Sequence, residues 1–184
     1  MGFFYSLGIN FDDLESAQTC KSKMISYKIQ LSDLSIVDKT ISIYKSKLTG
    51  GKIQYQVQIF PDGLQYVTGN KKLASPAFFY EIRSRLYEFL LSSVFYYNYA
   101  FFEFEGADYF LDVDIAAYLN IHGIGKIKEG DDNAASIAQY VATDFTSKRF
   151  LDGLVLSNIL YKELENKSDF QKFNDNYMWL PVRL

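Results

Sequence analysis

The sequence predicts an α+β fold in which an antiparallel sheet, built from a meander plus a hairpin, is packed with helices on one side. Three observations support this fold class. Apolar and polar residues alternate along residues 52–60, apolar residues recur at helical spacing along residues 76–94, and two more alternating runs meet at Gly106-Ala107. The chain has 184 residues, of which 48% are hydrophobic and 22% charged. We therefore expect a single domain over residues 1–184 with a sizeable core.

A helix at about residues 11–24 is the first predicted element. Asn10 can cap its N-terminus, acidic residues fill its first turn, and two lysines lie near its end, as the helix dipole favours. The preceding apolar run, Phe3 to Ile9, is too short for a signal peptide or a membrane span.

A three-stranded antiparallel meander is predicted next, at roughly residues 40–48, 52–60 and 64–69. Gly50-Gly51 and Pro61-Asp62-Gly63 provide its turns. The alternation predicts that one side of the middle strand packs on the core and that its polar side does not. The core side is Ile53, Tyr55, Val57 and Ile59, and the polar side is Lys52, Gln54, Gln56 and Gln58.

The segment from residue 76 to about residue 94 is predicted as a helix that covers the sheet. Ser75-Pro76 is a suitable helix start, because proline is favoured at the first helical position. Glu81 and Arg85 are expected to form an i,i+4 ion pair on the outer face.

Two further helices and a terminal strand are predicted in the C-terminal part. One helix is capped by Asp132 or Asn133 and runs to about Val141, and a helical pattern from Ser147 to Asn166 is interrupted by Gly153. The terminal strand spans Tyr177 to Leu180, and Pro181 confines it to a sheet edge or to the end of the strand.

Residues 96–114 form the predicted hairpin, and pairing around Gly106-Ala107 assigns them to two faces. The inner face is wholly apolar and contains Ala100, Phe102, Phe104, Tyr109, Leu111 and Val113. The outer face, which we name the acidic aromatic face, contains Tyr99, Phe101, Glu103, Glu105, Asp108, Phe110, Asp112 and Asp114. Like charges that lie opposite each other cost stability, roughly 0.2 to 1 kcal/mol per pair. Folding alone therefore gives no reason to place them together.

A basic protein partner would explain the acidic aromatic face. The carboxylates would steer the association of such a partner and neutralise its Lys and Arg residues. The aromatic side chains of the face would serve as anchors. The formal net charge of -3 and the sequence pI of about 5.2 argue against direct nucleic-acid binding. The alternative is that the acidic face only keeps the protein soluble and that the C-terminal helices cover its aromatic residues.

The sequence assigns no catalytic residue, no metal site and no cofactor. One histidine and one cysteine leave little for nucleophilic catalysis. Asp112-x-Asp114 resembles the opening motif of haloacid-dehalogenase phosphatases, but Ile115 follows where a threonine or glycine is usual, and no parallel βαβ series surrounds it. A divalent ion held by Asp112, Asp114 and Glu103 stays open as an alternative, and would make the protein a small metal-dependent hydrolase or nuclease.

The size, the lack of a catalytic constellation and the stretch from Tyr99 to Asp114 resemble the immunity proteins that bacteria pair with secreted toxins. The resemblance implies a small acidic protein that occludes a basic toxin effector, a nuclease in the first instance. The single cysteine fits a reducing compartment, so we expect a cytoplasmic protein without membrane association. A phage or plasmid protein that mimics nucleic acid, and a homo-oligomer formed through the strand at Tyr177 to Leu180, are open alternatives.

Overall fold

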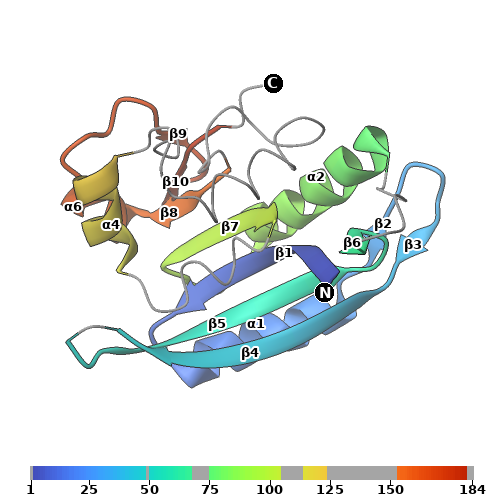
Figure 1. Ribbon diagram of the computed structural model, residues 1–184, viewed down its shortest axis with the longest axis horizontal. Helices are drawn as coiled ribbons and strands as arrows, with labels where there is room; N and C mark the ends of the chain where they lie inside the picture. Colours follow the sequence, from blue (N-terminus) through green and yellow to red (C-terminus); the bar gives the residue numbers. More distant parts are fainter. Residues whose placement is uncertain (1, 49, 68–74, 105–113, 124–152, 182–184) are drawn as a thin grey trace. The chain divides into compact units, whose positions relative to one another are not determined.

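The computed structural model describes residues 2–48, 50–67, 75–104, 114–123 and 153–181 (Figure 1). The chain divides into two compact units, residues 1–114 and residues 115–184. Within each unit the described strands pair antiparallel, and the fold class is α+β, which confirms the predicted fold class. None of the described helices is long and apolar enough to cross a membrane. The single domain over residues 1–184 stays a prediction.

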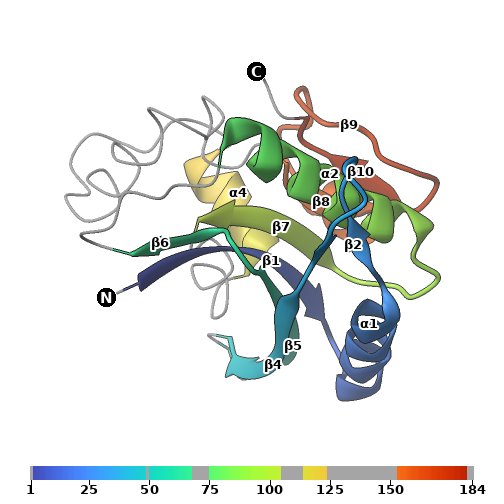
Figure 2. The same cartoon turned by 90° about the vertical axis from the view of Figure 1, so that its right-hand side faces the viewer.

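The first unit contains a sheet of four main strands with two helices on one side. Apart from three short strands described below, its elements follow the order βαββαβ, and the order of the main strands is β4-β5-β1-β7. This is the arrangement of the split βαβ, or ferredoxin-like, motif. Figure 2 shows both helices on the same side of the sheet. The elements are β1 (Gly2–Phe11), α1 (Leu14–Ser26), β4 (Lys39–Lys47), β5 (Ile53–Pro61), α2 (Pro76–Ser92) and β7 (Tyr99–Phe104).

Strand β1 lies between β5 and β7, in a segment where the sequence pattern predicted no strand. Leu7 pairs with Ile59 of β5 on one edge and with Phe102 of β7 on the other. Asn10 belongs to the strand and is buried. The prediction that Asn10 caps the following helix is therefore wrong.

Helix α1 begins three residues later than predicted because Asp13 is its N-cap. The Asp13 carboxylate accepts a hydrogen bond from the backbone N–H of Ser16, with an N···O distance of 2.7 Å, and another from the Ser16 hydroxyl. These two bonds hold the pKa of Asp13 below its ordinary value. Asn10 and Asp13 are both residue types that cap helices, and the pairing of β1 decided between them.

The predicted hairpin of β4 and β5 is confirmed. Nine residue pairs run from Lys39–Pro61 to Lys47–Ile53, and Gly50 and Gly51 turn the chain with φ of 105° and 90°. Such positive φ values favour glycine because it lacks a Cβ atom.

The third meander strand, β6 (Gln65–Val67), is present but pairs with β1 instead of β5. Gln65 lies opposite Phe4, whereas Ile59 of β5 lies opposite Leu7. The chain therefore continues in one direction along β1 through Asp62 and Gly63. The segment Pro61-Asp62-Gly63, predicted as a turn, therefore separates two strands that both pair with β1, and it does not reverse the chain.

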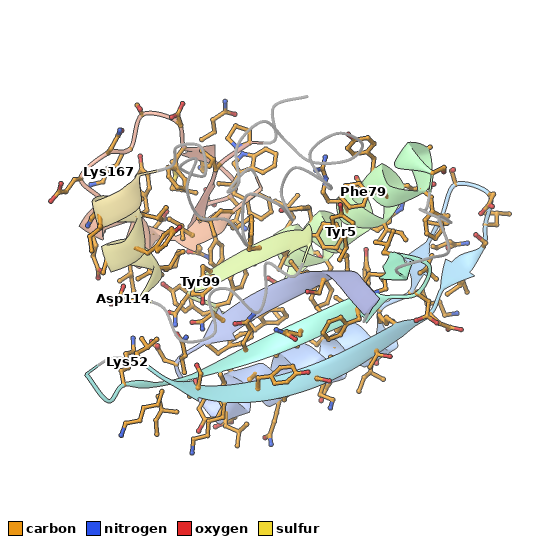
Figure 3. The ribbon with its side chains drawn as sticks, viewed as in Figure 1. Tyr5, Lys52, Phe79, Tyr99, Asp114 and Lys167 are labelled. Atoms are coloured by element: carbon orange, nitrogen blue, oxygen red, sulfur yellow. The ribbon has the colours of Figure 1, made fainter. Side chains whose placement is uncertain are left out.

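Helix α2 packs on the sheet as its periodicity predicts. Ser75 caps it, and the ring of Phe79 packs 4.7 Å from the Tyr5 ring of β1 and 5.6 Å from the Phe102 ring of β7 (Figure 3). Ile82, Leu86 and Leu90 are completely buried. Burial of each such side chain contributes about 1.5–3 kcal/mol relative to exposure.

The predicted ion pair between Glu81 and Arg85 is wrong, because Arg85 pairs with Glu88 instead. The Arg85 guanidinium donates to both carboxylate oxygens of Glu88, at 3.2 and 3.0 Å. Glu81 instead accepts a hydrogen bond from the backbone N–H of Ser32, in the loop after β2 (Ile29–Gln30). Tertiary contact with this loop therefore decides which carboxylate remains for Arg85.

The hairpin of β2 and β3 (Ile36–Val37) has an unusual tip. The Leu34 N–H donates to the Leu31 carbonyl and the Leu31 N–H donates to the Ser35 carbonyl, each at 2.9 Å. Leu34 adopts φ of 70° and is 75% exposed. Glycine is the usual residue at this left-handed position of a three-residue hairpin loop.

The second unit contains α4 (Ile115–His122), β8 (Val155–Ser157), α6 (Asn158–Glu163), β9 (Gln171–Lys172) and β10 (Tyr177–Trp179). Its strand order is β8-β10-β9. The predicted terminal strand is confirmed as β10, which is paired along both edges and so is not a sheet edge. Pro181 lies beyond the end of β10, and the end of the strand is one of the two positions that the sequence allowed for this proline.

The helical pattern predicted from Ser147 to Asn166 is wrong for most of its described part. Residues 155–157 form a strand, and only Asn158–Glu163 is helical, because Ser157 starts the helix by accepting a hydrogen bond from the Leu160 N–H. The helix predicted from Asp132 or Asn133 to Val141 lies outside the described residues.

Replacement of Leu34 by glycine should stabilise the protein. The left-handed conformation costs an L-residue about 1–2 kcal/mol. Glycine avoids this strain, but its greater loss of conformational entropy on folding offsets roughly 0.5–1 kcal/mol of the gain. We expect Leu34→Gly to raise the free energy of unfolding by about 0.5–1 kcal/mol, measured by urea denaturation. Leu34→Ala is the matched control, because it removes the exposed side chain but keeps the strain. Equal stability of the two variants would contradict the strained geometry.

Candidate functional site

The register of β7 places the first part of the acidic aromatic face on the side of the sheet opposite to α2. Tyr99 lies opposite Asn10, Phe101 opposite Gly8, and Glu103 opposite Ser6. Ala100 and Phe102 are buried on the other side, where Phe102 contacts Phe79 of α2. The predicted division of β7 into two faces is therefore confirmed.

The expectation that Tyr99 and Phe101 are exposed anchors for a partner is wrong. Their exposed fractions are 3% and 1%. Burial raises the pKa of Tyr99 above its ordinary value, and the charge of Asp114 adds to the effect. Alternation shows that residues share a side of a strand, but it does not show whether that side meets solvent. These two side chains are therefore packing residues of the protein interior.

The same side of the sheet carries a ladder of buried amide side chains that sequence reasoning missed. Gln54, Gln56 and Gln58 of β5 are buried, although the alternation along this strand suggested that only its apolar side was. Gln56 lies opposite Asn10 on one side and Tyr44 on the other. A signal was present in the sequence, since these positions hold neutral amides, which can be satisfied by hydrogen bonds within a protein, and no charged residue.

Asn98 links this ladder to the start of α1. Its side-chain Nδ2 donates to Asn10 Oδ1 at 3.1 Å and to Asp12 Oδ1 at 2.9 Å. Asp12 also forms an ion pair with Lys52, with a separation of 2.9 Å. These contacts join the segment before β7 to the end of β1 and to the β4–β5 turn. The segment that leads into the acidic residues is thereby anchored at its N-terminal end.

The remaining residues of the acidic aromatic face are placed in part. Asp114 is exposed and directly precedes α4, while Glu103 belongs to β7. Glu105, Asp108, Phe110 and Asp112 lie outside the described residues. Their pairing across Gly106-Ala107 and their role in partner binding stay predictions. The acidic run, residues 103–114, therefore begins in the ordered strand β7 and ends at an exposed aspartate.

An open cavity of about 390 Å³ lies between the β2–β3 hairpin and α2. Arg85 and Glu88 are paired in its wall, and this pairing raises the pKa of Arg85. The Tyr27 hydroxyl donates to the Arg85 carbonyl at 2.8 Å, and burial raises the Tyr27 pKa. The other lining residues are Lys28, Gln30, Leu31, Ser32 and Leu34.

The described residues contain no group of three His, Cys, Asp or Glu side chains close enough to hold a metal ion. Cys20 is completely buried in α1, and burial raises the pKa of its thiol. The reactive form of cysteine is the thiolate, so this residue is a packing residue of the core. Of the three carboxylates considered as metal ligands, only Asp114 has a described side chain.

Comparisons of the chain with protein-family models, with curated proteins and with solved structures find no match. The functional argument therefore depends on the residues themselves.

Replacement of Tyr99 by phenylalanine should reduce the loss of stability at alkaline pH. The folded-state pKa of Tyr99 is raised above the ordinary value of 10.0, so the unfolded chain releases the phenolic proton first. The contribution of Tyr99 is therefore fully present below pH 10 and is lost as the pH rises towards the folded-state pKa. One such group changes the free energy of unfolding by at most about 1.4 kcal/mol per pH unit.

The measurement is urea unfolding at a series of pH values on both sides of 10, the ordinary tyrosine pKa. Tyr99→Phe should show a shallower decline than the wild type. Tyr44→Phe is the control, because Tyr44 is 41% exposed and lies on an outer strand of the same sheet. Identical declines for the two variants would show that Tyr99 is accessible to water.

Proposed function

We propose that this protein is an inhibitor of the immunity type, which binds a basic toxin effector and blocks it sterically and electrostatically. The observation that carries the proposal is the acidic run, residues 103–114, which holds five carboxylates and no Lys or Arg. It connects β7 to α4, and its last residue, Asp114, is exposed. Binding residues are commonly presented by connections that a rigid scaffold positions.

The proposed contact residues are the five carboxylates together with Phe110: Glu103, Glu105, Asp108, Phe110, Asp112 and Asp114. A concentration of one sign of charge raises the association rate with a partner of opposite charge, on the order of 10- to 1000-fold. The effect decreases with salt, because the Debye length falls from about 10 Å at 0.1 M ionic strength to about 3 Å at 1 M. Since Tyr99 and Phe101 are buried, Phe110 is the aromatic residue that the proposal retains as a contact.

Charge reversal in the acidic run should weaken partner binding while the fold is retained. We expect Asp108→Lys/Asp112→Lys to lower the association rate with the basic partner by about tenfold at low salt. The difference from wild type should decrease at high salt. The partner is first captured from lysate of the native host with wild-type protein and identified by mass spectrometry, and the rates are then measured with the purified partner.

The matched control is Asp62→Lys/Glu163→Lys, which changes the net charge equally at exposed positions outside the acidic run. Thermal melts establish that both double variants fold. Capture of one basic protein by the wild type and the control, but not by the acidic-run variant, is the expected result. If all three proteins bind the partner at the same rate, the acidic run is not the interface.

A metal titration separates this proposal from a metal-dependent hydrolase or nuclease. An ion that binds only the folded state at a concentration of 100 Kd stabilises it by about 2.7 kcal/mol. We expect Mg²⁺ and Mn²⁺ to leave the melting temperature unchanged. A rise that disappears in Asp112→Asn/Asp114→Asn would contradict the inhibitor proposal and favour the hydrolase.

A further inference from the structure

Strand β4 is an edge strand among the described strands of the first unit. It is the end member of the order β4-β5-β1-β7, and its only partner among the described strands is β5. Figures 1 and 2 both show no described strand beyond it, while α1 packs on one side of the sheet. The strand is nine residues long, and its pairing with β5 is continuous. Its outer backbone N–H and C=O groups are therefore a template for another strand.

The charges on this edge are all positive. Lys39, Lys45 and Lys47 lie on β4, and the strand contains no acidic residue. The Lys39 ammonium donates to the Tyr27 carbonyl at 2.6 Å, so it is directed towards the body of the unit. Lys45 and Lys47 are exposed, and neither forms an ion pair with a residue in the described ranges. Since side chains alternate along a strand, these two ammonium groups share one side at a spacing of about 7 Å.

This charge pattern selects among the strands that could add to the edge. In antiparallel pairing of two copies centred on Ile43, Lys39 of one copy would face Lys47 of the other. Like charges opposite each other are destabilising, and edge lysines are a common device against such self-pairing. A strand with carboxylates at alternate positions would instead meet Lys45 and Lys47 with opposite charge. The same lysines thus oppose a second copy and favour an acidic strand.

We propose that the β4 edge is a strand-addition site for an extended segment of a protein partner that carries two acidic residues separated by one residue. The backbone of the segment pairs with β4, and its two carboxylates form ion pairs with Lys45 and Lys47. Main-chain hydrogen bonds supply affinity in this mode of recognition, and the side chains supply specificity. This site is independent of the acidic run, because it has the opposite charge and lies on a different strand of the unit.

The experiment uses the full chain and four fluorescein-labelled peptides of the same length as β4. The first alternates Thr and Val and carries two Glu residues separated by one residue, and the second carries Lys in place of both Glu residues. The other two are versions of the Glu peptide methylated on alternate backbone nitrogens, each of which blocks one edge of the peptide. Binding is measured by fluorescence anisotropy, and protection of the β4 amides by hydrogen exchange.

We expect the Glu peptide to bind at least about tenfold more tightly than the Lys peptide at low salt, and the ratio to fall as salt rises. Binding of the Glu peptide should protect β4 amides, and one of the two methylated versions should fail to bind. Equal binding of the Glu and Lys peptides, or binding of both methylated versions, would overturn the proposal.

Charge reversal on the protein completes the test. Lys45→Glu/Lys47→Glu should invert the preference, so that the Lys peptide binds more tightly than the Glu peptide. The control Lys23→Glu/Lys162→Glu has the same net charge at exposed positions of α1 and α6 and should keep the wild-type preference. An inverted preference in the control would show a nonspecific charge effect. A wild-type dimer in which the β4 amides are protected would also overturn the proposal, because a second copy would then occupy the edge.

Discussion

Strand β1 is paired along both of its edges, and the other elements of the first unit take their positions from that pairing. Leu7 pairs with Ile59 on one side and with Phe102 on the other, so β1, from the start of the sequence, lies between β5 and β7. The apolar side of β1 also provides Tyr5, on which Phe79 of α2 packs. Without β1, the β4–β5 hairpin and β7 would have no common neighbour within the unit. The constraint is one of backbone hydrogen bonding, because a buried strand must satisfy its N–H and C=O groups on both sides.

Because residues on both sides of the sheet are buried, its polar side chains help to fix the register of the strands. Gln56 and Val57 occupy opposite sides of β5, and both are buried. A register slip of one residue would exchange every amide for an apolar side chain, and a partly satisfied polar network is costly in the interior. The amide ladder therefore favours one register over its neighbours, in addition to the hydrophobic preference of the other side.

The same burial changes where binding chemistry can occur. Tyr99 and Phe101 of β7 are buried, whereas Lys45 and Lys47 of β4 are exposed. These strands occupy opposite ends of the order β4-β5-β1-β7. The two proposed binding sites therefore involve different strands of the unit: the acidic run begins in β7, and the exposed lysines lie on β4.

Local patterns determined the parts of the structure that depend on neighbours in the chain. Helix α2, the β4–β5 hairpin with its Gly50-Gly51 turn, and the two-sided division of β7 were predictable, because each depends on side-chain periodicity or on turn stereochemistry. The acidic run was also evident, since a cluster of like charges is a property of the sequence itself. These features included the fold class and the segment on which the proposed function depends.

Tertiary structure decided which strands are neighbours and which sides are covered. Alternation could not show that β6 pairs with β1, nor that Asn10 belongs to a strand and leaves Asp13 to cap α1. It could not show that Tyr99 and Gln56 are buried, because a pattern assigns residues to sides without stating what lies over each side. Pairing and burial depend on segments far apart in the chain. The sequence by itself therefore determined the two sides of β5 and β7, and only the packed structure decided which residues on those sides are buried.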